Sequence, residues 1–349
     1  MIDARFRAQH ASGQFPGGQL AVVHRGATVA DVAVGIASGH REGEPRVEVS
    51  NSILFPVFSV SKPFVAIAVA MLEERGRLDV NAPLSQYVPE WPADRTVLDV
   101  LTHRTGILLP EVVADETRWG DREGLVRAVA TTPPRYPRGT LAYAPYEYGW
   151  MLAEVFARAA GEPLPEFLER ELLKPAGIDV RFTTGSAEVA RSYWLGPKHV
   201  VAGVELSARW EAVHNNPATR ATFVPGAGML ATASALARFY ALLLEGGRGF
   251  LKPETIRAYT TLNVAAYDRS NRLPLRVGRG FLLGAPFPSV YGYFGTSACF
   301  GHAGAFCAVG GADPKTGLAL AWITNANRGP YDLLLRSMPL WAAARAAIR

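Results

Sequence analysis

Strand-forming segments stand at both ends of this 349-residue chain, and a long helical stretch separates them. Residues 19–24 and 27–35 are short, apolar and β-branched, and they flank Arg25-Gly26, which is typical of an antiparallel hairpin. Similar strand candidates return near the other end, at residues 277–283, 297–301, 305–312 and 318–324. Because strands from the two ends of a chain are readily joined in one antiparallel sheet, we expect a single sheet that unites both ends.

Helical periodicity dominates residues 60–175. Its clearest case begins at Pro63, where apolar residues recur every three or four positions until Gly76 ends the run. Further helices of this block are expected at residues 97–102, 123–131, 147–160 and 164–173. Outside it, the sequence predicts helices at residues 3–12, 233–245, 253–261 and 331–347. Residues 180–225 are expected to be irregular and rich in aromatic side chains.

The order of these segments predicts an α/β (α+β) fold with two lobes. Single hydrophobic cores stop growing near about 250–300 residues, so a chain of this length favours two lobes that share a cleft. Residues 1–58 and 226–349 would form a lobe with an antiparallel sheet flanked by the terminal helices. Residues 59–225 would form a mostly helical lobe, with the active site in the cleft between the two.

Composition narrows the class of protein further. With 49% hydrophobic and 19% charged residues, the chain resembles folded proteins rather than disordered ones. The net charge of +5 is spread out without a basic block, so no nucleic-acid partner is expected. No apolar run approaches the roughly 18 residues of a membrane span, and the N-terminus has no signal-peptide core. We therefore expect a cytoplasmic protein with no membrane partner, and the two cysteines, Cys299 and Cys307, make no disulfide framework.

A serine and a lysine three positions apart form the sharpest chemical signal. Ser59 and Lys62 lie at the start of the apolar helix, so their side chains share one helical face. A serine hydroxyl needs an adjacent base to act as a nucleophile, and a lysine is that base once its pKa falls. Burial and a helix N-terminus both favour the neutral amine. The alternative is that Ser59 caps the helix and Lys62 is solvated.

The residues around this pair resemble a known family. Residues 55–64 (FPVFSVSKPF) are similar to the nucleophile segment of serine β-lactamases and penicillin-binding proteins, above all class C-like β-lactamases, their esterase relatives and D-aminopeptidases. Further segments resemble other motifs of that family, in the family's order: residues 14–18 (QFPGG), 101–107 (LTHRTGI), 137–143 (PRGTLAY), 224–230 (VPGAGML) and 300–304 (FGHAG). The resemblance covers nearly the whole chain and implies the two-lobed β-lactamase-like fold.

The resemblance implies that Tyr143 is the phenol that shuttles protons with Lys62. A tyrosine beside an ammonium ionises more easily, so the two residues can share the role of base. The alternative for Tyr143 is core packing, because tyrosines are plentiful in this segment. Only the Pro-x-Gly-Thr-x-x-Tyr spacing selects Tyr143 from its neighbours.

The resemblance also implies an oxyanion hole and a substrate-binding strand. The backbone N–H groups of Ser59 and Ala305 would bind the oxyanion, and His302, Ala303 and Gly304 would form a strand edge that lines the cleft. Glycine at position 304 lets the backbone approach a substrate closely. His302 would bind or orient the substrate, and the alternative is a histidine satisfied within its own strand.

Two departures from the family pattern argue against efficient β-lactam hydrolysis. The second β-lactamase motif, Tyr-x-Asn, is here YAP at residues 143–145, so the asparagine amide is lost. The third motif, Lys-Thr-Gly, is replaced by HAG at residues 302–304, which removes a cationic anchor. Residues 315–317 spell KTG literally, but they are predicted to be a hairpin turn. Because esters need less help with their leaving group than amides, these departures favour an esterase.

The sequence therefore predicts a serine hydrolase that works through an acyl-enzyme, with a carboxylesterase on small or medium acyl esters as the first choice. The alternatives are an acyltransferase that uses the same acyl-enzyme, a D-amino-acid amide or peptide hydrolase, and a non-catalytic sensor. The expected partner is a small-molecule ester or amide, and the sequence specifies no oligomeric state.

No cofactor or metal is expected. Residues 226–231 match Gly-x-Gly-x-x-Ala, but no apolar strand leads into them, so they do not predict a dinucleotide site. Metal-spaced histidine and cysteine pairs are missing from the sequence. Four aromatic residues either wall an acyl pocket or pack between the lobes: Trp119, Tyr193, Trp194 and Trp210.

Overall fold

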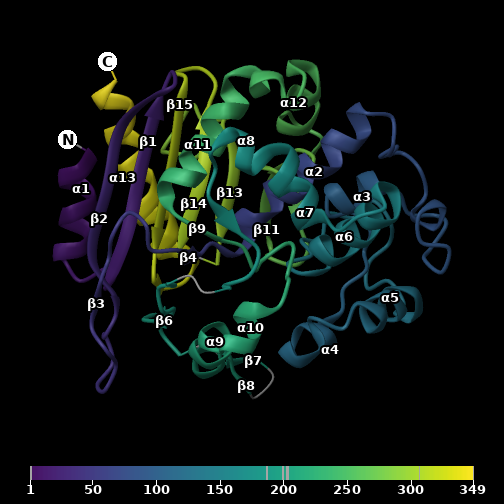
Figure 1. Ribbon diagram of the computed structural model, residues 1–349, viewed down its shortest axis with the longest axis horizontal. Coiled ribbons are helices and arrows are strands. Elements are labelled where there is room, and N and C mark those ends of the chain that lie inside the picture. Colours follow the sequence, from purple (N-terminus) through teal and green to yellow (C-terminus); the bar gives the residue numbers. More distant parts are fainter. Residues whose placement is uncertain (1, 186–187, 199, 202–203, 306, 349) are drawn as a thin grey trace.

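A nine-stranded antiparallel sheet unites the two ends of the chain (Figure 1). The computed structural model describes residues 2–185, 188–198, 200–201, 204–305 and 307–348. In spatial order the strands of the sheet are β10 (Val264–Asp268), β11 (Leu273–Val277), β12 (Leu282–Leu283), β13 (Phe300–Gly304), β14 (Ala308–Asp313), β15 (Leu318–Thr324), β1 (Gly17–His24), β2 (Ala27–Ser38) and β3 (Val47–Glu48).

The predicted joining of the two ends is confirmed by the pairing of β1. This strand lies between β2 and β15, with Gly18 opposite Thr324 and His24 opposite Leu318 in the β15 ladder. The predicted turn between β1 and β2 is also present. Arg25 and Gly26 have φ values of +48° and +82°, the pair of left-handed conformations that a tight hairpin turn with matching twist requires.

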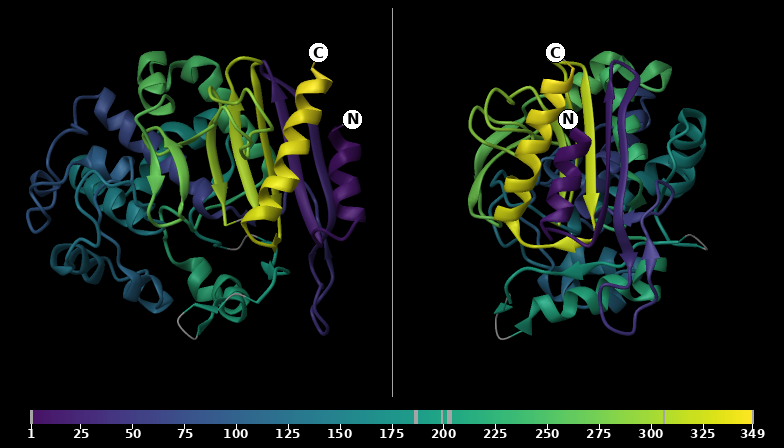
Figure 2. Two further views of the ribbon diagram at one scale, coloured as in Figure 1. Left: turned by 180° about the vertical axis from the view of Figure 1, so that it is seen from behind. Right: turned by 90° about the vertical axis from the view of Figure 1, so that its left-hand side faces the viewer.

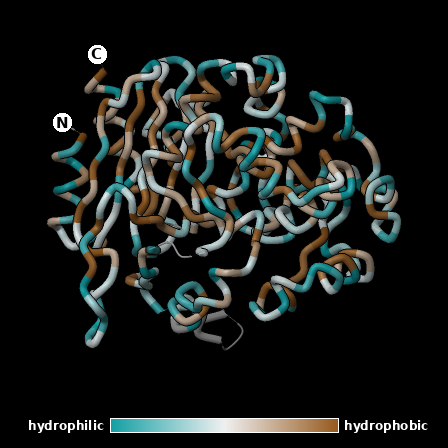
Figure 3. Tube along the Cα trace, viewed as in Figure 1, coloured by the Kyte–Doolittle hydropathy of each residue, from teal (hydrophilic) through white to brown (hydrophobic). Residues whose placement is uncertain are grey.

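Helices cover both faces of the sheet. The helices α1 (Ile2–Ala11) and α13 (Pro330–Ala347) pack together on one face (Figure 2). On the other face lies α11 (Ala233–Leu244), which packs against β1, β14 and β15. Alternate residues of β15 serve the two faces, because Trp322 lies in the core under α13 while Ile323 lies in the main core. In Figure 3 the strands of the sheet are largely brown, the colour of hydrophobic residues, whereas α1 is largely teal.

The helical block lies beside the sheet. Its central helix, α2 (Lys62–Glu74), is buried from Lys62 to Leu72 and packs against α6 (Glu147–Ala160) and α12 (Pro253–Thr260). The other elements of the block are η1 (Phe58–Ser61), η2 (Leu84–Gln86), α3 (Val97–Leu101), α4 (Pro110–Val113), η3 (Glu116–Arg118), α5 (Arg122–Thr131), α7 (Leu164–Leu168), the π-helical η4 (Glu169–Leu173) and α8 (Lys174–Ala176). No helix among the described residues is long and apolar enough to cross a membrane.

Short elements connect the sheet to the helical block. The strand β4 (Phe55–Pro56), which leads directly into η1, pairs with β9 (Leu230–Ala231), and β9 also pairs with β5 (Val180–Arg181). The remaining short elements are β6 (Tyr193–Trp194), β7 (Val200–Val201), β8 (Val204–Glu205), α9 (Leu206–Asn215), α10 (Pro217–Ala221), η5 (Gly246–Gly249) and β16 (Ala326–Asn327). The expectation of an irregular segment at residues 180–225 is therefore wrong where α9 and α10 form.

The strand predictions near the C-terminus need correction. The segment 277–283 is divided between β11 and β12, because Gly280 has φ +83° and a Cβ at Gly278 would lie 2.3 Å from the Tyr259 carbonyl oxygen. The strand β10 was not expected, because its sequence, VAAYD, does not alternate between apolar and polar residues. Most of its residues are exposed. The predicted strands 297–301 and 305–312 each start three residues too early compared with β13 and β14, and residue 306 lies outside the described residues.

Candidate active site

The predicted nucleophile lies in a tight turn between β4 and α2. Ser59 is the second residue of η1, and Phe58 before it has φ +49°, a left-handed conformation that is rare for a bulky residue. The Ser61 hydroxyl donates to the Phe58 carbonyl oxygen at 2.5 Å and accepts from the Met229 N–H at 3.2 Å. Ser61 therefore ties this turn to the segment before β9, so the second serine of the motif supports the backbone that presents the first.

Lys62 is fully buried directly behind Ser59. Its Nζ lies 3.0 Å from the Ser59 Oγ, 2.6 Å from the Pro145 carbonyl oxygen and 2.9 Å from the Gly226 carbonyl oxygen. Removal from water lowers the pKa of Lys62 to about 7, and the Glu147 carboxyl opposes this shift. The solvated alternative for Lys62 is thus wrong, and a sizeable neutral fraction of the amine exists near neutral pH.

Tyr143 completes a compact cluster with these two residues. Its side chain is hydrogen-bonded to Ser59, and its ring centroid lies 5.1 Å from the Lys62 Nζ. The expectation that the nearby ammonium eases ionisation of Tyr143 is wrong. Burial raises the pKa of the phenol above its usual value of 10, and this effect outweighs the hydrogen bond to Ser59. Tyr143 therefore stays protonated where Lys62 loses its proton.

Two residues without an assigned role in the sequence analysis fix the Tyr143 backbone. The Tyr143 N–H donates to the Asp268 Oδ1 at 2.7 Å, and Asp268 is fully buried. The next N–H, of Ala144, donates to the His103 Nδ1 at 3.2 Å, and the His103 ring lies 4.6 Å from the Tyr143 ring. Burial holds the pKa of His103 well below its usual 6.5, so its ring stays neutral. Asp268 ends β10, and the short polar stretch after it is the sequence signal that could have identified it.

Glu147, at the start of α6, is a buried carboxyl close to this cluster. Its Oε1 accepts from the Leu109 N–H at 2.7 Å, and its Oε2 accepts from the Tyr146 N–H at 3.2 Å. Burial raises the pKa of Glu147, and the Lys62 charge partly offsets that rise. Glu147 was not identified as a site residue from the sequence, because acidic residues are common in the first turn of a helix.

The strand β13 brings its glycine against the nucleophile turn. A Cβ at Gly304 would lie 2.0 Å from the Val57 carbonyl oxygen, so only glycine allows this approach. Among the described residues, β12 pairs with Phe300 and Gly301, so the ladder between β12 and β13 stops before residues 302–304. The role of these three residues as an edge that lines the cleft stays a prediction. Ala305 follows with φ +38°.

His302 lies within the fold rather than on an open wall. Its side chain is 1% exposed, its Nδ1 lies 2.7 Å from the Ala303 carbonyl oxygen, and its ring is 6.1 Å from the Tyr143 ring. Burial, reinforced by the Lys62 charge, lowers the pKa of His302 to about 3. This neutral ring cannot replace the cationic anchor of a Lys-Thr-Gly motif, and it matches the alternative of a histidine satisfied within its strand.

The KTG motif at residues 315–317 lies in a turn of the sheet, and the Gly-x-Gly-x-x-Ala motif at residues 226–231 lies beside Lys62. Residues 315–317 form the turn between β14 and β15, where the Gly317 N–H donates to the Asp313 carbonyl oxygen at 2.9 Å. The Gly226 carbonyl oxygen accepts from Lys62, so the segment 226–231 belongs to the lysine site rather than to a nucleotide loop. Cys299 and Cys307 are both buried free thiols.

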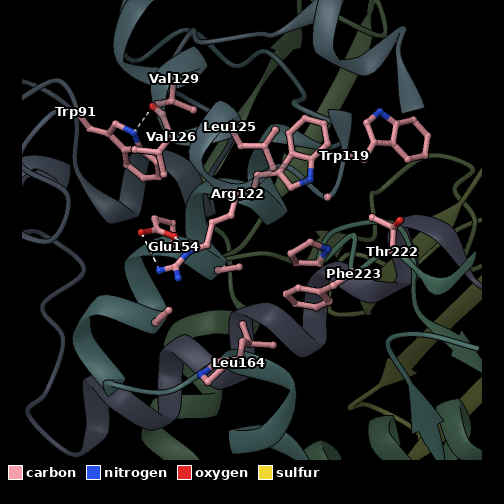
Figure 4. A pocket seen from close by; sticks show the side chains of 16 residues that line it. Trp91, Trp119, Arg122, Leu125, Val126, Val129, Glu154, Leu164, Thr222 and Phe223 are labelled. Atoms are coloured by element: carbon pink, nitrogen blue, oxygen red, sulfur yellow. Dashed lines mark hydrogen bonds and ion pairs between the residues drawn. The ribbon is translucent and has the colours of Figure 1, made fainter. Parts of the chain in front are cut away.

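Two cavities lie against α6, one at its first residue and the other along residues 150–157. A cavity of about 300 Å³ is lined in part by Tyr143, Pro145 and Glu147. A larger one of about 420 Å³ lies between α5 and α6, where the rings of Trp119 and Phe223 stand beside the Arg122–Glu154 ion pair (Figure 4).

Of the four aromatic residues identified in the sequence, one lines a cavity and the other three contact other side chains. Trp119 lines the larger cavity, whereas Trp210 packs beside Phe58 with ring centroids 5.0 Å apart. Trp194 packs edge-on against Trp210 at 5.9 Å, and the Tyr193 hydroxyl donates to Glu44 at 2.6 Å.

The fold and this serine–lysine–tyrosine cluster define a serine hydrolase, and comparison with known proteins identifies its family. The Beta-lactamase family model matches residues 2–340, so the chain belongs to the Beta-lactamase family. It is similar to Esterase/beta-lactamase LipL of Mycobacterium tuberculosis (strain ATCC 25618 / H37Rv), with 26% identity over 92% of this chain and 79% of the relative.

Two further proteins are similar to this chain. Esterase EstB of Burkholderia gladioli is 28% identical over 80% of this chain and 77% of its own length. The solved structure of a penicillin-binding protein homolog from Caulobacter crescentus has a TM-score of 0.83 and 26% identity, covering 99% of this chain and 96% of that one. The predicted β-lactamase-like fold is thereby confirmed.

Proposed function

We propose that this protein is a carboxylesterase in which Ser59 is the nucleophile and Lys62 its base. The observation that carries the proposal is the fully buried Lys62 amine, 3.0 Å from the Ser59 Oγ and with a pKa lowered to about 7. A base is most effective when its pKa lies near the working pH, because it is then largely free to accept a proton.

The reaction follows from the positions of these groups. The neutral Lys62 amine takes the Ser59 proton as the Oγ attacks the ester carbonyl, and the oxyanion is bound by the N–H groups of Ser59 and Ala305. Tyr143, which stays protonated, gives its proton to the departing alkoxide and is reprotonated from the Lys62 ammonium. Water then attacks the acyl-enzyme and Lys62 accepts its proton. As the bond between the acyl carbon and the Ser59 Oγ breaks, the Lys62 ammonium returns this proton to the Oγ, 3.0 Å away, and the free acid is released.

Two features of the site favour esters over β-lactams and amides. Pro145 stands where a β-lactamase has an asparagine, so no side-chain amide is available there to bind a substrate amide. His302 is a neutral, buried ring in place of a lysine, so it supplies no positive charge for a β-lactam carboxylate. Two relatives carry esterase in their names, which supports the same choice.

Turnover of a short p-nitrophenyl ester tests the proposal. We expect Ser59→Ala to reduce kcat by about 10³-fold or more, because an activated nucleophile is removed. The exposed Ser52→Ala, in the same segment, should keep wild-type activity. Intact-mass measurement should show a transient acyl adduct on the wild type and none on Ser59→Ala.

Four results would contradict this assignment. Ester turnover by Ser59→Ala at the wild-type rate would show that Ser59 is not the nucleophile. Faster turnover of nitrocefin than of the ester would favour a β-lactamase. An adduct that persists without release would favour the non-catalytic sensor, and transfer of the acyl group to an added alcohol in preference to water would favour the acyltransferase.

A further inference from the structure

The smaller cavity beside Tyr143 carries three arginines. Arg135, Arg269 and Arg272 line this space of about 300 Å³ together with Tyr143 and Pro145. Pro145 and Tyr143 also belong to the proposed catalytic cluster, since the Pro145 carbonyl oxygen accepts from Lys62 and the Tyr143 side chain is hydrogen-bonded to Ser59. The cavity therefore shares two of its lining residues with the proposed catalytic cluster.

None of these three arginines has an acidic partner among the described residues. Neighbouring arginines do: Arg138 pairs with Asp99 at 2.8 Å, and Arg279 pairs with Glu73 at 3.2 Å. The acidic residue in the cavity wall is Glu147, whose two oxygens already accept the Leu109 and Tyr146 N–H groups. The cavity is therefore positively charged.

The backbones that carry the arginines are firmly fixed. The Arg135 N–H donates to the Gly106 carbonyl oxygen at 2.8 Å, and a Cβ at Gly106 would lie 1.9 Å from the Tyr136 carbonyl oxygen. The Arg269 N–H donates to the Leu141 carbonyl oxygen at 3.0 Å.

The turn that carries Arg269 and Arg272 is tied to Tyr143 through one carboxylate. The buried Asp268 accepts from the N–H groups of Ser270 at 3.2 Å and Asn271 at 2.9 Å, and also from the Tyr143 N–H at 2.7 Å. The positions of these two arginines relative to the proposed proton donor are thus set by a shared anchor.

We propose that Arg135, Arg269 and Arg272 bind an anionic group, such as a carboxylate, on the leaving alcohol of the ester. The proposal rests on the proposed function, in which Tyr143 protonates the leaving group, so that the departing alcohol lies on the side of this cavity. Guanidinium groups bind carboxylates through charge-assisted and often bidentate hydrogen bonds. The preferred substrates are then esters of alcohols or phenols that carry a negative charge.

A matched pair of acetate esters tests this inference. The phenol of 4-acetoxybenzoate carries a carboxylate, and that of 4-acetoxybenzamide carries a neutral amide of similar shape. Each enzymatic rate is divided by the rate of spontaneous hydrolysis, which corrects for the leaving groups. We expect wild-type kcat/KM to be about tenfold or more higher for the anionic ester, a preference that declines with added salt because the arginines are exposed.

Three variants distinguish a charge effect from a structural one. The triple change Arg135→Gln, Arg269→Gln and Arg272→Gln should abolish the preference while leaving the neutral ester within about twofold of wild type. The corresponding triple change to lysine should retain part of the preference. Arg5→Gln, an exposed arginine on α1 without an ion pair among the described residues, should change neither rate.

The outcomes separate this inference from the proposed function. Equal normalised rates on both esters in wild type and in the triple glutamine variant overturn the anion site but leave the esterase intact. If neither ester is hydrolysed, the proposed function fails, and binding of 4-hydroxybenzoate followed by NMR still decides the inference. Binding that is weakened by the triple glutamine variant supports the anion site, and binding that is equal in both proteins overturns it.

Discussion

At the residue scale, the chemistry of the site depends on burial acting in opposite directions on two side chains. Loss of water disfavours the charged form of each group, so it lowers the pKa of Lys62 and raises that of Tyr143. In the proposed mechanism, the lysine is therefore the base and the tyrosine the acid. This division of roles follows from a shared, dry environment rather than from a special partner for either residue.

The activity should therefore follow the ionisation of Lys62. We expect kcat/KM for a neutral ester to rise with pH and to level off above about 7, because only the neutral amine accepts the Ser59 proton. His302 titrates near pH 3 and the pKa of His103 also lies well below 6.5, so neither produces this rise. A pH–rate profile measures it.

The variant Lys62→Arg tests whether Lys62 is the group that causes this pH dependence. Lys62→Arg keeps a cation at all working pH values and should be inactive throughout, since arginine does not lose its proton. A wild-type profile that stays flat across pH 7, or a Lys62→Arg enzyme with an unchanged rise, would contradict Lys62 as the base.

At the scale of elements, the nucleophile turn is held between two segments that are distant in sequence. Ser61 ties it to Met229 before β9, and β13 presses Gly304 against Val57. The motif order placed these segments in one site, but the close contact at Gly304 is visible only once β13 and η1 are packed together.

The contact at Gly304 should be intolerant of a side chain. Gly304→Ala would place a Cβ 2.0 Å from the Val57 carbonyl oxygen, so either β13 or the turn must move. We expect kcat to fall by about 10²-fold or more, because a displacement of roughly 1 Å at the nucleophile has that effect. Ester turnover measures it, and circular dichroism checks that the variant is folded.

A second glycine provides the control. At Gly120, an added Cβ would meet the side chain of Thr222 at 3.3 Å, which can adjust, so Gly120→Ala should keep nearly wild-type turnover. Equal activity of Gly304→Ala and Gly120→Ala would show that the approach of β13 to the turn is not required.

At the scale of the whole molecule, burying Lys62 makes stability depend on pH. Its pKa is about 7 in the folded protein and near 10.5 in the unfolded chain, so between these values the unfolded chain binds the extra proton. The free energy of unfolding contributed by Lys62 therefore rises with pH in this window, by up to about 1.4 kcal/mol per pH unit. Below pH 7 both states are protonated and this dependence disappears.

Comparison with Lys62→Met isolates that contribution. We expect the difference in unfolding free energy, wild type minus variant, to increase between pH 7 and about 9 when measured by urea denaturation. Titrating groups that do not interact with Lys62 are common to both proteins and cancel in the difference, and His302, which does interact with it, has a pKa of about 3, below this range. A difference that is constant over this range would mean that Lys62 keeps its proton in the folded state.

The sequence by itself determined much of this molecule. The apolar periodicity of α2 and α6 and the strands at both ends predicted the main helices and the joining of the two ends in one sheet. The spacing of Ser59 and Lys62 predicted that their side chains lie together, and they are 3.0 Å apart. These features depend on local propensity and on the alternation of apolar residues, which the chain carries in its own order.

The protonation states of Lys62 and Tyr143 and the lining of the cavity beside Tyr143 were decided only by the tertiary structure. The pKa values of Lys62 and Tyr143 depend on how much water is excluded by segments far away in sequence. The segments that carry Pro145 and Gly226 contact Lys62 in this way. The roles of Asp268 and the arginine-lined cavity likewise arise where β10, its following turn and the segment before α6 meet. Burial and long-range contact are properties of the folded chain, so no local pattern records them.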